Sequence, residues 1–320
     1  MTSKNPTTSF MLFSIFFYGI CSCSMNFINK FVLTSWSFNQ PAILLLGQLP
    51  LLSLVLRVLK ASGKIELVTY DLKTAKSCAL LSVLYCANSV IALVALSGMN
   101  VPMYNALRRC IPLASMLLGY FVFTKRPTFN IFMSIIVITI GAAVAASGDL
   151  NFHLKSYAMG ITSAILMSLQ LIVLQYNGTE KHLTSLDLLY VNSINCIPIV
   201  FTLSLGTFTD VLNYPHWTDI GFLFSFFLVV ISGCVLNYSM FLCTTINSAL
   251  TTTCVGAIKS GFTTLIGIFA FGDVTPTAPF LVGQAINFGG GLMYAYAKFQ
   301  HTRSIKENTQ QLQNVKVVKT

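Results

Sequence analysis

The stretch Ile220–Leu242, IGFLFSFFLVVISGCVLNYSMFL, contains no Lys, Arg, Asp, Glu or His. A helix that crosses a lipid bilayer needs about 20 consecutive, mostly apolar residues, and this run meets both conditions. Runs of the same kind on either side of it predict ten membrane-spanning helices in the chain. They are Phe10–Leu33, Gln40–Leu56, Ser77–Leu96, Val101–Phe123, Phe129–Ala146, Tyr157–Gln175, Leu188–Leu205, Ile220–Leu242, Ser248–Phe271 and Ala278–Ala297.

The composition of the whole chain excludes a soluble protein. Of the 320 residues, 55% are hydrophobic and only 9% are charged, and the mean hydropathy is +0.75. A soluble chain carries about 25% charged residues. A soluble enzyme, a disordered protein and a nucleic-acid-binding protein are therefore excluded. The chain is predicted to be an all-α integral membrane protein whose partners include membrane lipid and no nucleic acid.

The net charge of +10 reports the orientation of the chain in the membrane. If both termini are cytosolic, fourteen of the 19 Lys and Arg residues lie in cytosolic segments. The other side then holds only Lys155, and the remaining four lie inside spans. Because cytoplasmic loops carry the excess of Lys and Arg, both termini are predicted to be cytosolic.

Two similar segments indicate that the chain contains an internal repeat. Gly119–Thr128, GYFVFTKRPT, is similar to Gly267–Thr277, GIFAFGDVTPT, with one inserted residue. Each begins near the end of a span that contains a basic residue and runs towards the next span. Weak internal similarity of this kind is typical of transporter halves. With five spans in each half, the two copies must cross the bilayer in opposite directions. We expect one transporter domain made of a repeat at about 10–146, an inverted repeat at about 157–297, and a cytosolic tail at 298–320.

The four cations inside the spans are Lys30, Arg108, Arg109 and Lys259. Each costs roughly 2.5–3.5 kcal/mol to place in the bilayer, unless it is paired or lines a wet cavity. All nine acidic residues lie in loops, tails or span edges, so the counter-charge has to come from a lipid or a soluble anion. A phosphate suits this role, because Arg binds it bidentately and Lys binds it as a point charge. Two simpler interpretations stay open, namely that Lys30 snorkels to the interface and that Lys259 contacts backbone carbonyls.

Polar side chains near these cations provide the rest of a candidate site. Asn29 and Lys30 lie on one face of the first span, and Tyr190 and Asn192 lie on the seventh. The others are Thr251, Thr252 and Gly256, which precede Lys259, and Tyr294 in the last span. Amides can bind the edge of a nucleobase, and tyrosines can stack on a base or a sugar. The alternative is ordinary hydrogen bonding between membrane helices.

Catalytic and metal-binding groups are missing from the spans. None of the four His residues and no acidic residue lies at depth, so a carboxylate or imidazole proton relay is disfavoured. The nine Cys residues form no CxxC pair and are expected to be apolar packing residues. We therefore predict no enzyme activity, no cofactor and no metal site.

Three segments carry a resemblance to a known family. Asn29–Leu33 (NKFVL), Pro102–Arg109 (PMYNALRR) and Gly256–Lys259 (GAIK) resemble segments of the nucleotide-sugar transporters of the drug/metabolite transporter superfamily. The longer stretch Leu236–Lys259 is similar to the D subgroup of solute carrier family 35. Tyr294–Phe299 and the 271–277 loop are similar to an orphan member of that subgroup.

The resemblance implies a ten-helix fold of two inverted five-helix repeats. It also implies exchange of a cytosolic nucleotide sugar for a lumenal nucleoside monophosphate, usually in the Golgi membrane. The Phe-Tyr-Asn-Asn motif of GDP-mannose carriers is replaced here by residues 190–193, YVNS, and their Gly-Ala-Leu-Asn-Lys motif by residues 256–260, GAIKS. These departures favour a UDP-sugar of the UDP-glucuronate, UDP-N-acetylgalactosamine or UDP-N-acetylglucosamine type.

The resemblance assigns a role to each part of the site. Arg108 and Lys259 would bind the phosphates, and Tyr190 and Asn192 would contact uracil. Thr251, Thr252, Gly256 and Tyr294 would shape the sugar end of the site. Arg108 is chosen over Arg109 because it matches the basic position of the family pattern.

Several alternatives stay open at this point. The protein could instead be a non-transporting scaffold or trafficking adaptor, or a phosphate-sugar or organic-anion antiporter of the same fold. The endoplasmic reticulum and endosomes are alternatives to the Golgi, and a homodimer is an alternative to a monomer.

Overall fold

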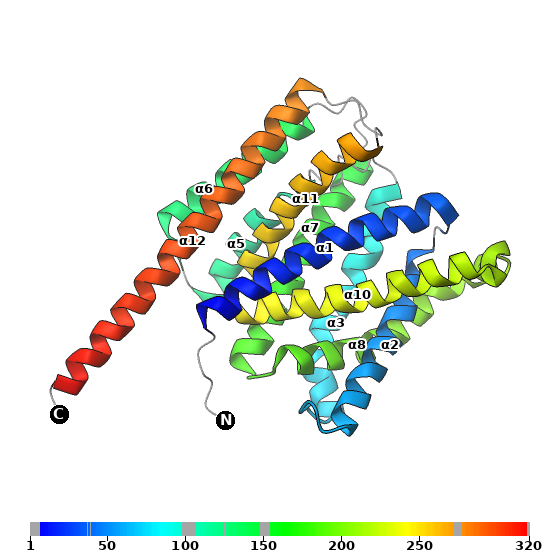
Figure 1. The fold of residues 1–320 in the computed structure, drawn as a ribbon, viewed down its shortest axis with the longest axis horizontal. Helices are drawn as coiled ribbons and strands as arrows, with labels where there is room; N and C mark the ends of the chain where they lie inside the picture. Colours follow the sequence, from blue (N-terminus) through cyan, green and yellow to red (C-terminus); the bar gives the residue numbers. More distant parts are fainter. Residues whose placement is uncertain are drawn as a thin grey trace.

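The computed structural model describes residues 7–36, 38, 40–97, 107–124, 126–147, 154–271 and 277–318. Over these residues the chain forms helices and no strands (Figure 1). The helices of the first part are α1 (Thr8–Trp36), α2 (Pro41–Ala61), α3 (Leu72–Ser97), α5 (Ile111–Phe123) and α6 (Phe129–Ala146). The second part contains α7 (Leu154–Glu180), α8 (Ser185–Ser204), α9 (Phe208–Leu212), α10 (Ile220–Ile246), α11 (Ala249–Phe271) and α12 (Ala278–Val318). Two 3₁₀ turns, η1 (Leu205–Thr207) and η2 (Pro215–Thr218), flank the short α9.

Each of the ten predicted spans corresponds to a helix, but several helix ends differ from the prediction. The predicted α2 ends at Leu56, whereas the helix continues to Ala61, and α12 continues beyond Ala297 to Val318. Hydropathy predicts where a helix leaves the bilayer. Because the backbone hydrogen bonds of a helix are made within the helix, it can continue past that point into water. The start of the fourth predicted span, residues 101–106, lies outside the described residues.

Long apolar helices make this a multi-pass membrane protein. Among the described residues, 6 helices are long and apolar enough to cross a bilayer, and they lie in α1, α2, α3, α7, α8 and α10. The apolar helices Ile111–Phe123 and Phe129–Ala145 are shorter. Large hydrophobic side chains such as Phe121, Phe129 and Ile220 are more than 70% exposed. A bilayer covers such side chains, which in a soluble protein would form large apolar patches.

Helix packing links the part before residue 147 to the part after residue 154. Helix α6 packs along α12, α3 along α7, α1 along α10, and α2 along α8. The pairs α3–α8 and α10–α2 are also in contact, as are α5–α7 and α11–α1. Exchanging the first five long helices, in order, with the last five converts every one of these pairs into another pair of the same set. Both second helices, α2 and α8, contain an internal proline, Pro50 and Pro198.

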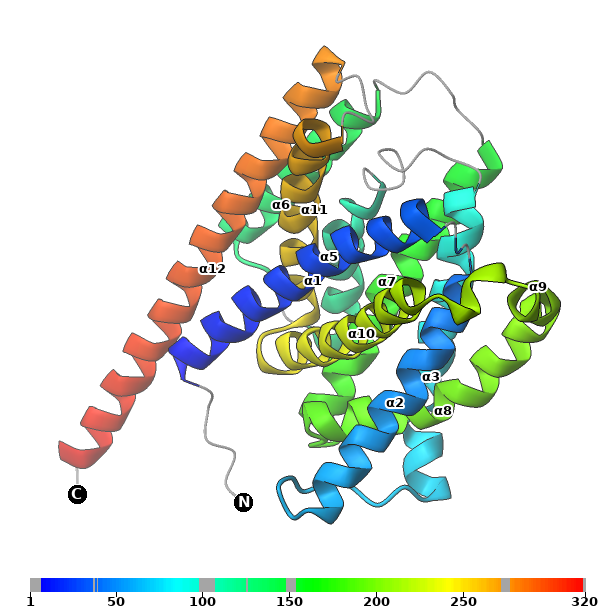
Figure 2. The ribbon, with the colours of Figure 1, turned by 45° about the vertical axis from the view of Figure 1, so that its right-hand side comes forward.

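The α6–α12 pair is held at unusually short range by glycines. In Figures 1 and 2 the two helices run side by side along one edge of the molecule. A Cβ atom on Gly141 would lie 2.8 Å from the carbonyl oxygen of Gly283, and one on Gly283 would lie 2.6 Å from that of Gly141. Asn287 donates a hydrogen bond to the carbonyl of Ile138 across the same interface, at 2.9 Å. Close packing of small residues of this kind drives association of helices in membranes.

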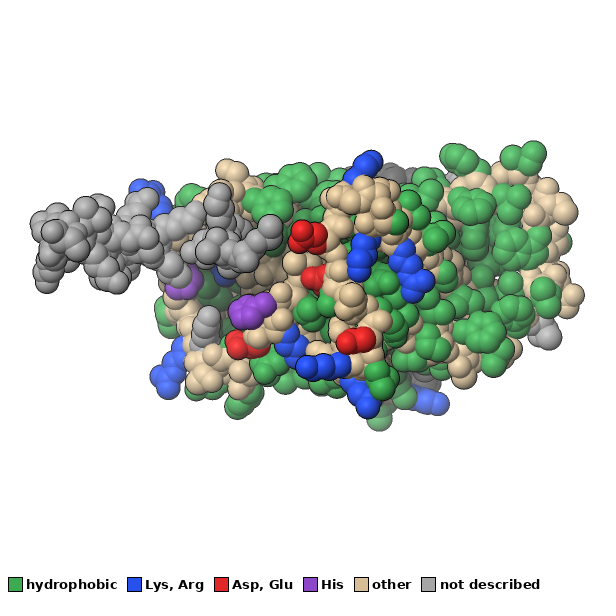
Figure 3. All heavy atoms as spheres, turned by 90° about the horizontal axis from the view of Figure 1, so that it is seen from below, with side chains coloured by type: hydrophobic (Ala, Val, Ile, Leu, Met, Phe, Trp, Pro, Cys, Tyr) green, Lys and Arg blue, Asp and Glu red, His purple; other side chains and the backbone are tan. Residues whose placement is uncertain are grey.

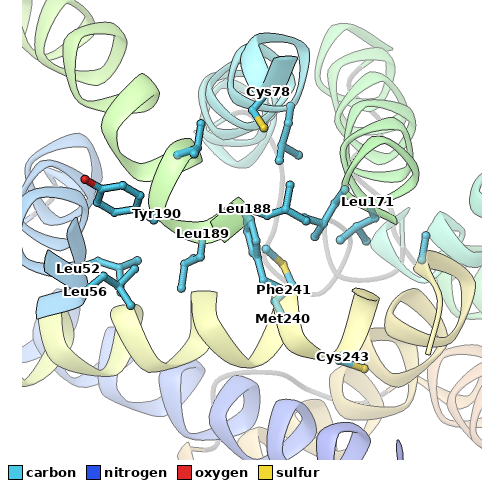
Figure 4. Packing of buried hydrophobic residues seen from close by; sticks show 14 of the residues in the cluster. Leu52, Leu56, Cys78, Leu171, Leu188, Leu189, Tyr190, Met240, Phe241 and Cys243 are labelled. Carbon is cyan, nitrogen blue, oxygen red and sulfur yellow. The ribbon is translucent and has the colours of Figure 1, made fainter. Parts of the chain in front are cut away.

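The largest buried core joins both parts of the chain. Figure 4 shows Leu52 and Leu56 of α2 on one side of Leu189 of α8, and Phe241 of α10 on the other side, below Leu188. Helices α3 and α7 add Cys78, Leu171, Ile172 and Leu174 to the same cluster. Helix α8 is therefore packed on several sides, and its side chains are placed by tertiary contacts.

Polar contacts join the loops at the end of the molecule where α8 begins. Thr184 and Asp187 form a capping box at the start of α8, and the Asp187 carboxylate also accepts a 2.7 Å hydrogen bond from the backbone N–H of Val68. Lys181 donates to the carbonyl of Ser77 at 2.6 Å. The α2–α3 loop is thereby attached to the α7–α8 turn.

The two ends of α1 have different chemistry. The start of α1 and the C-terminal end of α12 point to the same end of the molecule, as Figures 1 and 2 show. Lys, Arg, Asp, Glu and His side chains gather on the face seen from below in Figure 3. At the far end of α1, by contrast, Trp36 and Phe38 pack with Tyr214, Trp217 and Phe222. Aromatic side chains of this kind are enriched at membrane interfaces.

Replacing Gly283 by Val should destabilise the protein, because the added carbons would meet the backbone of α6. Overpacking of this kind costs about 1–3 kcal/mol, so we expect a clearly lower Tm. The measurement is the temperature at which detergent-solubilised protein is lost from its size-exclusion peak. Gly289→Val is the matched control on the same helix, because a Cβ on Gly289 meets nothing within 4 Å. Equal losses for both variants would show that the glycine contact is not what joins α6 to α12.

Candidate functional site

Lys259 lies on α11 and reaches across to α1. Its ammonium group donates hydrogen bonds to the side-chain and backbone oxygens of Ser22, the latter at 3.3 Å, and the side chain is half-buried. The contact with a carbonyl matches the simpler interpretation of this lysine, and it also places the charge at the α1–α11 interface.

Arg108 is a second cation whose charge reaches Lys259. It lies just before α5, its side chain is exposed, and its charge acts on both Lys259 and the hydroxyl of Tyr18. Helices α1, α5 and α11, which surround these two cations, contain no Asp or Glu in their sequences. Two like charges close together without a carboxylate on the surrounding helices favour the binding of an anion.

Arg109 has a different role from its neighbour. Its side chain is only 1% exposed, and its Nε donates a 2.9 Å hydrogen bond to the hydroxyl of Ser260 on α11. The side chain therefore lies between helices and ties the start of α5 to α11. Neighbouring residues on a helix point about 100° apart, which explains why Arg108 and Arg109 do not share one environment.

Tyr18 and Ser22 belong to the site but were not selected from the sequence. Tyr18 is buried, lies one helical turn before Ser22 on α1, and lies close to Gly256, since a Cβ on that glycine would be 3.9 Å from the tyrosine hydroxyl. A signal for both was present, because steps of four residues back from Lys30 reach Asn26, Ser22 and Tyr18. Residues four apart share one helix face. Asn29 and Lys30 lie within α1, but their side chains lie outside the described residues.

Three other predicted residues lie within buried helix–helix contacts. The hydroxyls of Thr251 and Tyr294 are 3.2 Å apart and join α11 to α12. Thr252 accepts a 3.0 Å hydrogen bond from Thr244 of α10. Tyr294 also packs with Ile135 and Cys254 in a separate core cluster. These contacts fit the alternative of interhelical hydrogen bonding, and each polar group already has a partner.

Tyr190 and Asn192 lie in another group of contacts, on α8. The Tyr190 hydroxyl accepts a 3.1 Å hydrogen bond from Nε of Arg57, whose guanidinium also lies 5.8 Å from the ring centre. Asn192 is buried and accepts a 3.0 Å hydrogen bond from Ser82 of α3. The structure thus brings Lys259, Arg108 and Gly256 together with Tyr18 and Ser22, and it holds the α8 residues against α2 and α3.

Over the described part of the chain, no group of three His, Cys, Asp or Glu side chains is arranged to hold a metal ion. The nine cysteines are free thiols.

The chain is similar to known transporters along nearly its whole length. Residues 8–295 match the model of the Triose-phosphate Transporter family. The UDP-galactose/UDP-glucose transporter 7 of Arabidopsis thaliana is 34% identical, with 93% of each chain covered. The nucleotide sugar transporter SLC35D2 of Homo sapiens is 32% identical over 92% of this chain and 88% of its own. The UDP-N-acetylglucosamine transporter UGNT1 of Arabidopsis thaliana is 30% identical, with 88% and 86% covered.

One protein of known crystal structure has a similar fold. It superimposes with a TM-score of 0.65 at 13% sequence identity, and the match covers 92% of this chain and 99% of the other. At this identity the likeness concerns the fold alone.

Replacing Arg109 by Ala should destabilise the protein more than replacing Arg108. The first change removes a buried hydrogen bond to a charged group, which contributes about 1.5–3 kcal/mol, and it leaves a cavity between α5 and α11. Arg108→Ala is the adjacent control and should retain a near wild-type Tm in detergent, because its side chain is exposed. Equal Tm losses for the two variants would contradict the separate positions of the two side chains.

Proposed function

The chain belongs to the Triose-phosphate Transporter family, and on that premise we propose that it is a nucleotide-sugar transporter that exchanges a UDP-sugar for UMP. The observation that carries the proposal is the pair Arg108 and Lys259, two cations whose charges act on each other beside helices that contain no Asp or Glu. A diphosphate brings negative charge that both cations can bind. The relatives named for UDP-sugars support the choice of nucleotide. A transporter of this kind catalyses no chemical reaction.

The two cations differ in what they offer to a phosphate. The Arg108 guanidinium can bind two phosphate oxygens at once, whereas the Lys259 ammonium acts as a point charge. In the described conformation Lys259 is bonded to Ser22, so a phosphate would replace or share that contact. With the ligand absent, the two like charges repel each other. The proposed site is therefore stabilised when an anion is bound, which favours exchange over unaccompanied reorientation.

The remaining predicted residues are proposed to recognise the base and the sugar. Tyr190 and Asn192 are proposed to contact uracil, which requires them to leave Arg57 and Ser82 in the substrate-bound conformation. Thr251, Thr252 and Tyr294 are proposed to offer hydroxyls to the sugar end. Gly256 leaves room beside the Tyr18 hydroxyl. Because each of these groups already has a protein partner, binding exchanges one hydrogen bond for another at little net cost.

We also propose that residues 10–146 and 157–297 are inverted repeats within one ten-span domain. The support is the set of helix pairs α1–α10, α3–α7, α6–α12 and α2–α8, which is unchanged when the halves are exchanged. Alternating access then follows from rocking of one half against the other around a central site. The excess of Lys and Arg on one side supports cytosolic termini. The Golgi membrane is the proposed location, because cytosolic nucleotide sugars are used there.

A second candidate is a sugar-phosphate antiporter of the same fold. The name of the family, which refers to triose phosphates, favours it, and the two cations would suit a monophosphate as well as a diphosphate. The two candidates differ in their need for a nucleobase, and the exchange experiment below separates them.

Preloading proteoliposomes with UMP should accelerate the uptake of a labelled UDP-sugar, because an occupied cavity reorients more readily than an empty one. Preloading with uridine should have no such effect, since uridine has no phosphate for Arg108 and Lys259. Uptake is measured in the first minute for both preparations. Equal acceleration by UMP and uridine would contradict the phosphate anchor, and acceleration by a triose phosphate alone would favour the second candidate.

Lys259→Ala and Arg108→Ala should each reduce uptake per molecule. A hydrogen bond to a charged group is worth about 1.5–3 kcal/mol, which corresponds to a roughly 10- to 150-fold loss. Arg108→Lys should recover part of the activity, because a positive charge remains. Protein abundance in the vesicles is measured alongside uptake. Normal uptake by both well-expressed alanine variants would contradict the phosphate-binding role of the two cations, whereas absence of uptake by the wild type would support the adaptor alternative.

A further inference from the structure

A groove of about 280 Å³ runs between α3 and α8. It exists because the side chains that α3 presents there are small, namely Ala75, Ala79 and Ser82, and the facing part of α8 contains Pro198. Ser82 is buried at the floor, whereas Ala79 and Pro198 are exposed. The groove is therefore open to the surface of the protein between α3 and α8, and its lining does not include the cations Arg108 and Lys259.

The sides of the groove face the hydrocarbon part of the bilayer. Val83, which lines it, is 53% exposed, and Leu80 on the same helix is 59% exposed. Phe201, just beyond the α8 end of the groove, is 47% exposed. Such exposed side chains are stable next to lipid tails and costly next to water. The molecule that fills the groove must accordingly be apolar over most of its length.

One end of the groove is polar and positively charged. Lys76 and Tyr70 line this end, and the Tyr70 hydroxyl donates a 2.9 Å hydrogen bond to Asn195. The Tyr70 ring packs edge-on against the Tyr190 ring, with 6.4 Å between the ring centres. The guanidinium of Arg57 lies over the Tyr190 ring, 5.8 Å from its centre. A second cation therefore lies near this end of the groove, separated from Tyr70 by the ring of Tyr190. The nearby Asp71 accepts a hydrogen bond from the backbone N–H of Thr74 at the start of α3.

We propose that this groove binds one anionic phospholipid, with its phosphate at Lys76 and one acyl chain along α3 and α8. The length fits, because the groove runs from Lys76 to Val83, roughly 10 Å along a helix, within a leaflet whose hydrocarbon half is about 15 Å thick. The charge fits as well, since a basic group lies at the membrane surface and apolar side chains lie below it. Attraction of Lys and Arg to anionic lipid is strongest at the cytoplasmic leaflet, so this step rests on the proposed orientation.

The position of this lipid gives it contact with both halves of the chain. Helix α3 belongs to the first half and α8 to the second, and the Ser82–Asn192 hydrogen bond lies at the floor of the groove. A lipid seated there contacts both partners of an interface that changes in alternating access. The site therefore links the lipid composition of the leaflet to the stability of one arrangement of the halves.

The test measures lipid binding to the purified full-length protein, without transport. Delipidated protein is mixed with phosphatidylinositol or with phosphatidylcholine of the same acyl chains, and bound lipid is counted by native mass spectrometry. The wild type should retain phosphatidylinositol in preference to phosphatidylcholine. Lys76→Gln should weaken phosphatidylinositol retention about fivefold, the effect of one basic residue near anionic lipid. Lys73→Gln, on the same exposed helix start but outside the groove, should retain the wild-type value.

A second pair of variants tests the acyl chain. Ala79→Leu fills the groove and should reduce retention of phosphatidylinositol, whereas Ala285→Leu, at an exposed position on α12, should not. Equal retention of the two lipids by the wild type would overturn the proposal and indicate a neutral occupant such as a sterol. Identical behaviour within either pair of variants would also overturn it. Because uptake is not the readout, these results are independent of the proposed transport function.

Discussion

Inside a bilayer the backbone has no water to bond with, and this constraint explains most of the architecture. Each N–H and C=O group that crosses the membrane has to be satisfied within its own segment, so the regular structure of the described residues is entirely helical. Apolar burial against lipid gives no preference for one helix neighbour over another. The choice of neighbours then depends on close contact and hydrogen bonds, as at Gly141, Gly283 and Asn287 in the α6–α12 pair.

The same constraint makes each charge at depth informative. Arg109 is retained by a hydrogen bond to Ser260 and by burial between α5 and α11, so its contribution is to assembly. Arg108, just before α5, and Lys259, on α11, are cations whose charges act on each other, and α1, α5 and α11 contain no Asp or Glu. In the proposed function, binding an anion would offset the cost of placing them in the membrane, which would connect the energetics of the fold to transport. A single residue step along the chain therefore separates a structural arginine from a proposed binding arginine.

Polar side chains of α8 show how one interface can have several roles. Tyr190 and Asn192 hold α8 to α2 and α3 through Arg57 and Ser82. In the proposed transport cycle the same groups are released to a nucleobase, so substrate binding would loosen a contact between the two halves. The adjacent α3–α8 groove and its proposed lipid lie on the membrane side of that contact. Substrate and lipid would then act on one movable interface from opposite sides.

The sequence alone located the apolar helices, because hydropathy over about 20 residues is a local property. The runs Phe129–Ala146 and Ile220–Leu242 correspond to α6 and to most of α10. It also singled out Lys259 and Arg108, since a charge within an apolar run is visible without a structure. Helix ends beyond the bilayer, such as those at Ala61 and Val318, were missed because hydropathy does not report them. Only the tertiary structure decided that Tyr18 and Ser22 join the cations and that Tyr190 and Asn192 lie against other helices, because those neighbours are brought together by helix packing between residues far apart in the chain.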